Sequence, residues 1–229
     1  MSAYGDLVAH SGLSAAHRLL LAAVPDGSTV LDVGCAEGYL AAALAARGCE
    51  VHGVERDERA AERARAHCAA VSTIDVEDAV ARAALPGAFD AAVLGDVLEH
   101  LRDPWAVLGW ATARLRPGGI AVVSVPNAAH WTVRRELLRG RFPLRDWGTF
   151  DRTHLRWFTR ASAQDLVRGA GLTIEREQFT PAPLPGEPLV RRADDPPGRA
   201  LRRARQAAAD RRPELFALQF VLTARRPGQ

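Results

Sequence analysis

Two carboxylates and a histidine follow a hydrophobic run within five residues of one another. In the stretch GDVLEHLRDP (95–104), these side chains are Asp96, Glu99 and His100. A helical turn beginning at Asp96 would place all three on one face, because residues three and four apart are helix neighbours. Such a group can bind a divalent cation or accept a proton. A structural alternative stays open, in which Asp96 caps a helix, Glu99 pairs with an arginine and His100 is packed or acts alone as a base.

A later histidine, His154, is the candidate partner of this group. It lies in FDRTHLRWFTRASAQDL (150–166), before an aromatic pair and before Thr159, which we predict to be a helix N-cap. We expect His154 or His100 to act as the base, directly or through a metal. The candidate metal ligands are Asp96, Glu99, His100 and His154.

A glycine turn between a strand and a helix is the candidate nucleotide site. The sequence VLDVGCAEGYL (30–40) places Gly34 and Gly38 where the backbone could approach a ligand. A dinucleotide fingerprint requires a third glycine where this chain has Tyr39, which argues against NAD. Glu55 ends the next strand, where a carboxylate can accept two ribose hydroxyls. Asp75 ends the third strand, where its carboxylate could accept a hydrogen bond from an adenine amino group.

The elements that would position these residues alternate along the chain. Strand patterns lie at 28–34, 50–56, 71–75, 89–96 and 120–127, and helix patterns at 39–48, 57–70 and 103–119. This alternation predicts an α/β fold with a parallel sheet and helices on both faces. After a helix pattern at 197–212, the strand-like segments 172–179 and 215–226 are expected to pair as an antiparallel edge.

The region 128–160 interrupts the alternation and follows a strand end, where open α/β sheets place their sites. We therefore predict a substrate-side insertion at 128–160 within a single domain, 1–229. His130 and Trp131 could line the pocket or pack as a loop. Four aromatic residues are expected in the core rather than as a substrate platform: Trp147, Phe150, Trp157 and Phe158. The N-terminal Tyr4, His10 and His17 are candidate lid residues or surface residues.

Composition limits the class of protein. The chain has 229 residues, is 48% hydrophobic and carries a net charge of only +3, too small to indicate a nucleic-acid partner. Its apolar runs are shorter than a bilayer requires. Cys35, Cys49 and Cys68 lack metal-type spacing and are expected to be reduced thiols. We expect a cytoplasmic monomer or homodimer.

The glycine turn, Glu55, Asp75 and the stretches FDAAVLGDVLEHL and LRPGGIAVVSVPN together resemble the successive motifs of class I S-adenosylmethionine-dependent methyltransferases. The resemblance implies a Rossmann-like seven-stranded sheet, mostly parallel with an antiparallel last strand. It also implies the cofactor-binding residues Asp32, Gly34, Cys35, Gly38, Glu55, Asp75, Val76 and Gly95. Ala36 departs from the family, which most often has glycine there.

In this resemblance, each group of residues has a role. Gly34, Cys35 and Gly38 would line the methionine moiety, and Asp32 would support its amino group. Glu55 would hold the ribose. Asp75 and Val76 would flank the adenine, and Gly95 would lie near the sulfonium.

The Asp-x-x-Glu-His set with the later His154 resembles two groups within this superfamily. These are the ubiquinone-pathway O-methyltransferases and the small-RNA 3′-terminal 2′-O-methyltransferases, both of which usually have glutamate where this chain has Asp96. The stretch GTFDRTHLRWFT also resembles bacterial methyltransferases that do not require a metal.

The expected function is S-adenosylmethionine-dependent O-methylation of a small-molecule hydroxyl. A divalent metal (Mg, Mn, Fe, Co or Zn) is a possible second cofactor, and nucleic acid is not the expected partner. Two alternatives stay open: 2′-O-methylation of RNA ends, and a catalytically silent methyltransferase-like binding domain.

Overall fold

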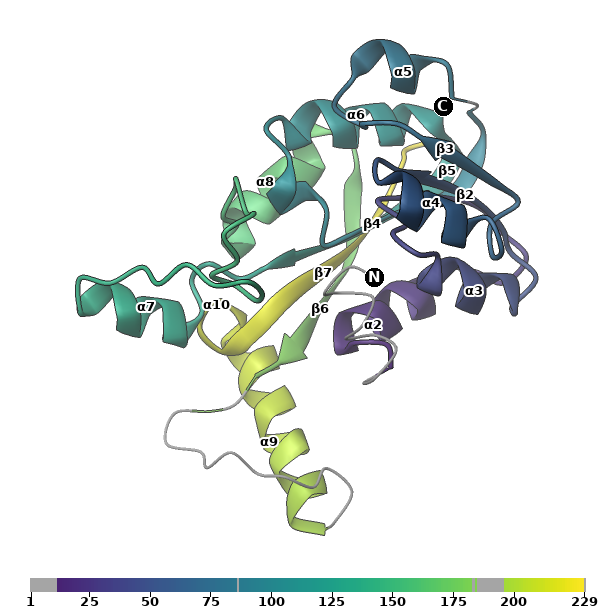
Figure 1. Ribbon diagram of the computed structural model, residues 1–229. Helices are drawn as coiled ribbons and strands as arrows, with labels where there is room; N and C mark the ends of the chain where they lie inside the picture. The colour runs from purple at the N-terminus through teal and green to yellow at the C-terminus, as the bar shows by residue number, and fades with distance from the viewer. Residues whose placement is uncertain (1–11, 86, 183, 185–195, 229) are drawn as a thin grey trace.

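A seven-stranded sheet forms the centre of the computed structural model, which describes residues 12–85, 87–182, 184 and 196–228 (Figure 1). The strand order is β3-β2-β1-β4-β5-β7-β6, and β7 runs antiparallel to both of its neighbours while the other pairs are parallel. The strands are β1 (Thr29–Val33), β2 (Glu50–Glu55), β3 (Ala70–Thr73), β4 (Phe89–Gly95), β5 (Leu115–Pro126), β6 (Thr173–Pro181) and β7 (Ala217–Arg225). The predicted fold class is confirmed.

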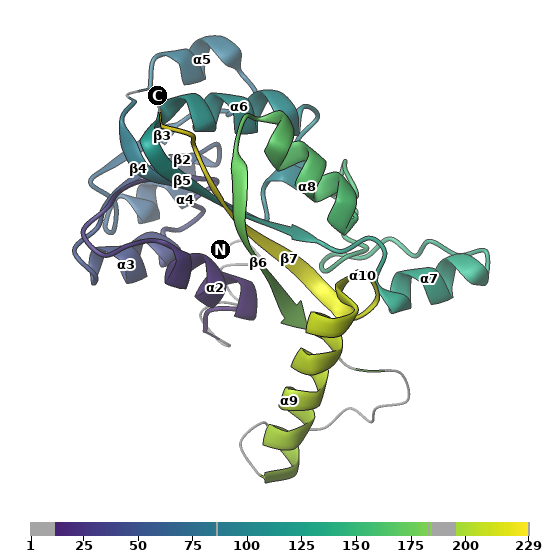
Figure 2. The same cartoon turned by 180° about the vertical axis from the view of Figure 1, so that it is seen from behind.

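Helices cover both faces of the sheet (Figures 1 and 2). The helices of the described residues are α2 (Ala15–Ala23), α3 (Tyr39–Ala45), α4 (Glu58–Ala64), α5 (Ala79–Ala83), η1 (Leu98–His100), α6 (Pro104–Arg114), α7 (Trp131–Leu138), α8 (Arg160–Gly169), α9 (Pro196–Arg211) and α10 (Pro213–Phe216), of which α7 and α9 project away from the sheet. Side chains of one strand alternate between two cores: Val30 packs with α2 and α3, whereas Leu31 packs with α6 and α8. Strands buried on both faces explain the nearly continuous apolar runs in the sequence.

Two predicted N-caps are present. The Asp57 carboxylate accepts from the backbone N–H of Ala60 at 2.8 Å and begins α4. Thr159 begins α8 with a capping box that it shares with Ser162. These caps satisfy backbone donors that would otherwise lack a partner at a helix start.

Three predicted helices end earlier than expected, and the one predicted at 39–48 ends at Ala45. The helix predicted at 103–119 stops at Arg114, and β5 begins at once with Leu115. Tertiary hydrogen bonds decide this boundary, because Gly118 and Gly119 exchange backbone hydrogen bonds with Arg226, just after β7. The helix predicted at 57–70 ends at Ala64 and continues as turns.

The segment between β5 and α8 leaves the sheet and carries α7 outward (Figures 1 and 2). Phe150 and Phe158 are buried, as predicted. Trp147 and Trp157 are 72% and 44% exposed, so the prediction that they lie in the core is wrong. The segment extends beyond the sheet, and the described residues leave these two rings exposed there. Within the described part of the chain, helices long and apolar enough to cross a membrane are absent.

Candidate active site

The glycine turn after β1 has a backbone that only small residues can adopt. Gly34 and Gly38 have φ angles of 71° and 80°, in the left-handed region that favours glycine. A Cβ atom on Gly34 would lie 2.5 Å from Val97 Cγ2, and one on Gly38 would lie 2.9 Å from Ala64 Cα. Ala36 also has a positive φ, 48°, which gives a physical reason for the glycine that relatives most often have at this position.

Glu55 links the end of β2 to this turn. Its carboxylate accepts from the backbone N–H of Ala36 at 3.0 Å and from those of Arg56 and Asp57, each at 2.8 Å. The turn is therefore fixed by the same side chain that the resemblance assigns to the ribose. Charge-assisted hydrogen bonds of this kind are stronger than neutral ones.

Asp32 is a buried carboxylate beneath the turn. It is 2% exposed, and its Oδ2 atom has no hydrogen-bond partner among the described residues. Burial, with a smaller effect from Glu55, raises the pKa of Asp32 to about 7. An amino group brought close to this oxygen would satisfy it, so the residue fits its predicted role beside the methionine moiety.

The remaining cofactor candidates lie at neighbouring strand ends. Asp75 is exposed after β3 and accepts from the backbone N–H of Glu77, whereas the adjacent Val76 is buried. Gly95, at the end of β4, has little room for a side chain, because a Cβ there would lie 2.8 Å from Leu20 of α2. The described part of the N-terminal segment thus packs over the strand end that the resemblance places near the sulfonium.

Of the N-terminal lid candidates, Tyr4 and His10 lie outside the described residues. His17 is buried in α2, with its ring centroid 5.1 Å from that of Tyr39. Burial lowers the pKa of His17, although Asp96 acts in the opposite sense. This electrostatic contact places His17 close to the end of β4.

Asp96 does not lie on a helical turn with Glu99 and His100. Its φ is 53°, and the short helix η1 begins only at Leu98. The Asp96 carboxylate accepts from Ser124 Oγ at 2.6 Å and from Gln219 Nε2 at 2.9 Å. A non-glycine residue in the left-handed region is strained, and these partners on β5 and β7 hold it there.

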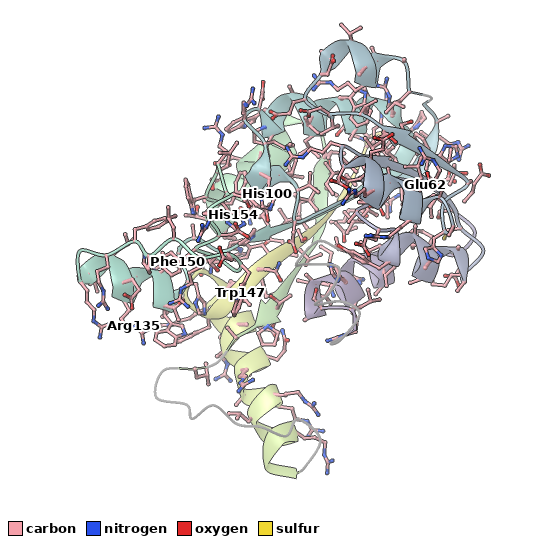
Figure 3. The ribbon with its side chains drawn as sticks, viewed as in Figure 1. Glu62, His100, Arg135, Trp147, Phe150 and His154 are labelled. Carbon is pink, nitrogen blue, oxygen red and sulfur yellow. The ribbon has the colours of Figure 1, made fainter. Side chains whose placement is uncertain are left out.

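Glu99, His100 and His154 form the group that the structure brings together. Figure 3 labels His100 and His154, whose rings are neighbours. One ligand atom from each residue lies within 4.8 Å of the others, and Asp96 is not a member of this group. The two histidine rings pack edge to face with centroids 4.8 Å apart. The backbone carbonyl of Glu99 accepts from Leu155 and Arg156, which docks the insertion against η1 and brings His154 into place.

The carboxylate of this group is buried without a partner among the described residues. Glu99 is 1% exposed, and both carboxylate oxygens lack hydrogen-bond partners among the described residues. Burial, with a further effect from Asp96, raises the pKa of Glu99 well above its ordinary value. Burial and His100 lower the pKa of His154, although Asp151 acts in the opposite sense. Among the described residues Glu99 has no arginine partner, contrary to the alternative in which it pairs with one.

Each histidine of the group has a backbone or hydroxyl partner that orients its ring. His100 Nδ1 lies 3.2 Å from the Thr153 carbonyl oxygen and 3.1 Å from Thr153 Oγ1. His154 hydrogen bonds to the backbone of Thr149. A fixed ring leaves the second nitrogen of each histidine to accept a proton or to bind a metal.

Sequence reasoning missed three polar residues that shape the site. Ser124 and Gln219 hold Asp96, and Asn127 ties the start of the insertion to the C-terminal region by donating to the carbonyl oxygens of Pro213 and Ala217. Ser124 and Asn127 are fully buried. The sequence could have revealed Ser124 and Asn127, because a polar residue inside or just after an apolar strand is buried and needs a hydrogen-bond partner. The sequence left open whether His130 lines the pocket or packs as a loop residue. The structure shows that His130 is buried and caps α7.

Residues 9–177 match the family model described as a methyltransferase domain. The chain belongs to the methyltransferase domain family. The predicted resemblance to class I S-adenosylmethionine-dependent methyltransferases is thereby confirmed.

Curated relatives include two proteins named ubiquinone biosynthesis O-methyltransferase. The one from Thiobacillus denitrificans is 32% identical over 155 residues, which are 65% of this chain and 66% of the relative. The one from Neisseria meningitidis serogroup A is 33% identical over 161 residues, which are 65% of each chain. The match therefore spans just under two thirds of the length of these relatives.

Solved structures share the fold. A SAM-dependent methyltransferase from Archaeoglobus fulgidus superposes with a TM-score of 0.64 at 14% identity, covering 98% of this chain and all of that chain. An S-adenosylmethionine-dependent methyltransferase from Mesorhizobium loti gives a TM-score of 0.61 at 18% identity, covering 93% of this chain and 99% of that chain. At these identities the likeness supports the fold alone.

Proposed function

We propose that the protein transfers a methyl group from S-adenosylmethionine to a hydroxyl of a small molecule. The proposal rests on one observation: a chain that matches the methyltransferase domain over residues 9–177 brings Glu99, His100 and His154 together. The relatives named ubiquinone biosynthesis O-methyltransferase support oxygen as the acceptor atom.

In this proposal the cofactor residues keep the roles that the resemblance implies. The bound sulfonium supplies an electrophilic methyl group. Gly34, Gly38 and Asp32 hold the methionine moiety, and Glu55 holds the ribose. The acceptor oxygen attacks the methyl carbon in line, the carbon–sulfur bond breaks and the thioether leaves. Alignment of the two reactants and exclusion of water supply much of the rate enhancement.

The acceptor hydroxyl must lose its proton, and His154 is the proposed base. Its lowered pKa keeps the ring neutral at pH 7, because protonation then requires a lower pH than for an ordinary histidine. The Thr149 backbone orients the ring, and the nitrogen that does not bind it is free to take the proton. His100, packed against His154, is the second candidate base.

As an alternative to His154 acting directly as the base, we propose that Glu99, His100 and His154 hold a divalent cation. The two unpartnered oxygens of Glu99 fit this role, because a buried carboxylate without partners is costly unless a positive charge lies beside it. Two imidazoles and one carboxylate favour Mn, Fe, Co or Zn over Mg. A cation there would hold neighbouring acceptor hydroxyls and lower their pKa. Asp96 stays with Ser124 and Gln219 in this arrangement.

The segment 128–160 is the proposed acceptor-side insertion, since it contributes His154 and follows the end of β5. We expect the purified chain to transfer a labelled methyl group from S-adenosylmethionine to catechol, a probe with two adjacent hydroxyls, or to another member of a small-molecule panel. Native mass spectrometry would show retained cofactor and metal. Failure to bind S-adenosylmethionine would refute the function, whereas full activity after exhaustive chelation would refute only the metal.

A further inference from the structure

Two cysteine side chains meet beside the glycine turn. Cys35 lies in that turn, after β1, and Cys68 lies between α4 and β3. A Cβ atom on Gly53 of β2 would lie 2.6 Å from Cys35 Sγ and 3.3 Å from Cys68 Sγ. Because β2 pairs with β1 on one side and with β3 on the other, the sheet brings the two sulfur atoms over Gly53 from opposite sides. The space that Gly53 leaves without a side chain is bordered by both sulfurs.

The two thiols differ in their access to solvent. Both cysteines are free thiols in the structure. Cys35 is 3% exposed, whereas Cys68 is partly exposed. A small solute therefore reaches Cys68 more easily than Cys35. The remaining cysteine, Cys49, is buried elsewhere, with its thiol 3.5 Å from the carbonyl oxygen of Pro25.

A hydrogen bond between the two thiols gives them different acidities. It lowers the pKa of Cys68, and the backbone of Gly53 acts in the same sense, although burial and Asp32 oppose the change. The same hydrogen bond, together with burial, raises the pKa of Cys35. Cys68 is therefore the more readily ionised thiol, and the thiolate is the form that reacts with oxidants. An accessible thiol of lowered pKa beside a second cysteine is the arrangement of redox-sensing pairs.

We propose that Cys35 and Cys68 are a modification site, at which hydrogen peroxide converts the two thiols into a reversible disulfide. The Cys68 thiolate attacks one peroxide oxygen, the O–O bond breaks, hydroxide leaves and Cys68 becomes a sulfenic acid. The Cys35 sulfur then attacks the Cys68 sulfur, the S–O bond breaks, and water leaves with the proton of Cys35. The two sulfurs together lose two electrons, and the two peroxide oxygens gain them.

The disulfide acts on cofactor binding, a consequence that rests on the proposed function. An S–S bond is much shorter than a contact between two thiols, so its formation draws Cys35 toward Cys68. Ala36 follows Cys35 directly, and its backbone N–H donates to the Glu55 carboxylate at 3.0 Å. Movement of Cys35 therefore disturbs the hydrogen bond that fixes Glu55, the side chain proposed to hold the ribose. Oxidation is expected to weaken the binding of S-adenosylmethionine.

The first test counts thiols in the full chain before and after treatment with hydrogen peroxide. Alkylation of the denatured protein and mass spectrometry should find three free thiols in the reduced chain and one, Cys49, after oxidation. Peptide mapping should find Cys35 joined to Cys68, and dithiothreitol should restore all three thiols. Cys68→Ser should form no disulfide, and Cys68→Ala is a second variant in case serine destabilises the fold. Cys49→Ala is the matched control and should form the disulfide as the wild type does.

The second test is calorimetry with S-adenosylmethionine. The disulfide form should bind at least about tenfold more weakly, because the loss of one charge-assisted hydrogen bond is already of that size. Dithiothreitol should recover the affinity. Cys68→Ser should bind as the reduced wild type does, both before and after peroxide. A reduced wild type that does not bind would refute the proposed function, and the disulfide would still be judged by the thiol count.

Three results would overturn the proposal. If Cys68 is oxidised to a sulfinic acid without a link to Cys35, the two sulfurs do not meet in solution. If Cys49 is oxidised as fast as Cys68, the pair has no special reactivity. If the disulfide form binds S-adenosylmethionine as tightly as the reduced form, the disulfide has no effect on the cofactor turn.

Discussion

Replacing Glu99 with glutamine is expected to stabilise the protein when metal is absent. Glu99 is 1% exposed, and its two carboxylate oxygens lack hydrogen-bond partners among the described residues. Glutamine keeps the size and shape of the side chain and removes the charge. The substitution therefore removes the penalty of ionising a buried group, and it should also remove the proposed metal site.

The sign of the pH dependence follows from the raised pKa of Glu99. In the unfolded chain this carboxyl ionises above about pH 4.5, whereas in the folded protein it holds its proton to a higher pH. The free energy of unfolding of the wild type therefore decreases as the pH rises through this interval. Glu99→Gln should show little advantage near pH 4.5 and its full advantage at pH 8.

The magnitude follows from the charge, because an unpartnered buried polar group costs about 1–3 kcal/mol and a charged one costs more, while glutamine retains only the neutral cost. For a chain of this length, 1 kcal/mol shifts the melting temperature by about 2–4 °C, so a difference of about 1 kcal/mol or more should raise the melting temperature of Glu99→Gln by at least about 2–4 °C at pH 8. The measurement is scanning calorimetry of the chelator-treated protein at both pH values. Added Mn²⁺ should stabilise the wild type, by about 2.7 kcal/mol at 100 times its dissociation constant, and leave the variant unchanged.

Glu136→Gln is the matched control. Burial acts to raise the pKa of Glu136, but Arg141, Arg135 and Arg139 outweigh it and lower the pKa below its ordinary value. The charged form of Glu136 is therefore stabilising above the unfolded pKa, and its loss should lower the melting temperature at pH 8. If Glu99→Gln lowers the melting temperature as Glu136→Gln does, Glu99 has a partner that the structure does not show, and the reasoning fails.

Three further predictions concern the cofactor turn and the base. Glu55→Ala should weaken S-adenosylmethionine binding in calorimetry by at least about tenfold, since each charge-assisted hydrogen bond is worth about 1.5–3 kcal/mol; unchanged affinity would remove Glu55 from the site. His154→Ala should keep its affinity for the cofactor and lower turnover by about 10²-fold or more. Because the pKa of His154 is lowered, the wild-type rate should fall only at a pH below the ordinary histidine pKa. A variant as fast as the wild type would exclude His154 as the base. Gly38→Ala should destabilise the fold in urea by more than Gly48→Ala does, because both have positive φ but only Gly38 lacks room for a Cβ; equal losses would contradict the steric argument.

Local pattern was enough to determine the fold. The central strands β1, β4 and β5 were predictable because strands buried on both faces have short, nearly continuous apolar sequences. The caps Asp57 and Thr159 were predictable because a side-chain oxygen before a helix satisfies nearby backbone donors. The end of α6 at Arg114 was not predictable, because it is decided by backbone hydrogen bonds to Arg226, which lies far along the chain.

The glycine turn was also predictable from the sequence, because a left-handed backbone favours glycine, whereas the lack of room for a side chain at Gly34 and Gly38 comes from the tertiary neighbours Val97 and Ala64. The proximity of Glu99, His100 and His154 was predictable only as a hypothesis. His154 lies 54 residues after His100 in the sequence. The hydrogen bonds that join the two segments run from the backbone N–H groups of Leu155 and Arg156 to the Glu99 carbonyl, and backbone atoms leave no trace in the choice of side chains.

Tertiary structure alone decided the place of Asp96. Helical spacing predicted that it would join Glu99 and His100, but its left-handed backbone turns it toward Ser124 and Gln219. These partners come from β5 and β7, which are adjacent only because the sheet places the last strand between β5 and β6. Spacing along the chain determines which side chains share a local turn. Strand order determines which distant polar groups, here Ser124 and Gln219, lie close enough to bind the Asp96 carboxylate.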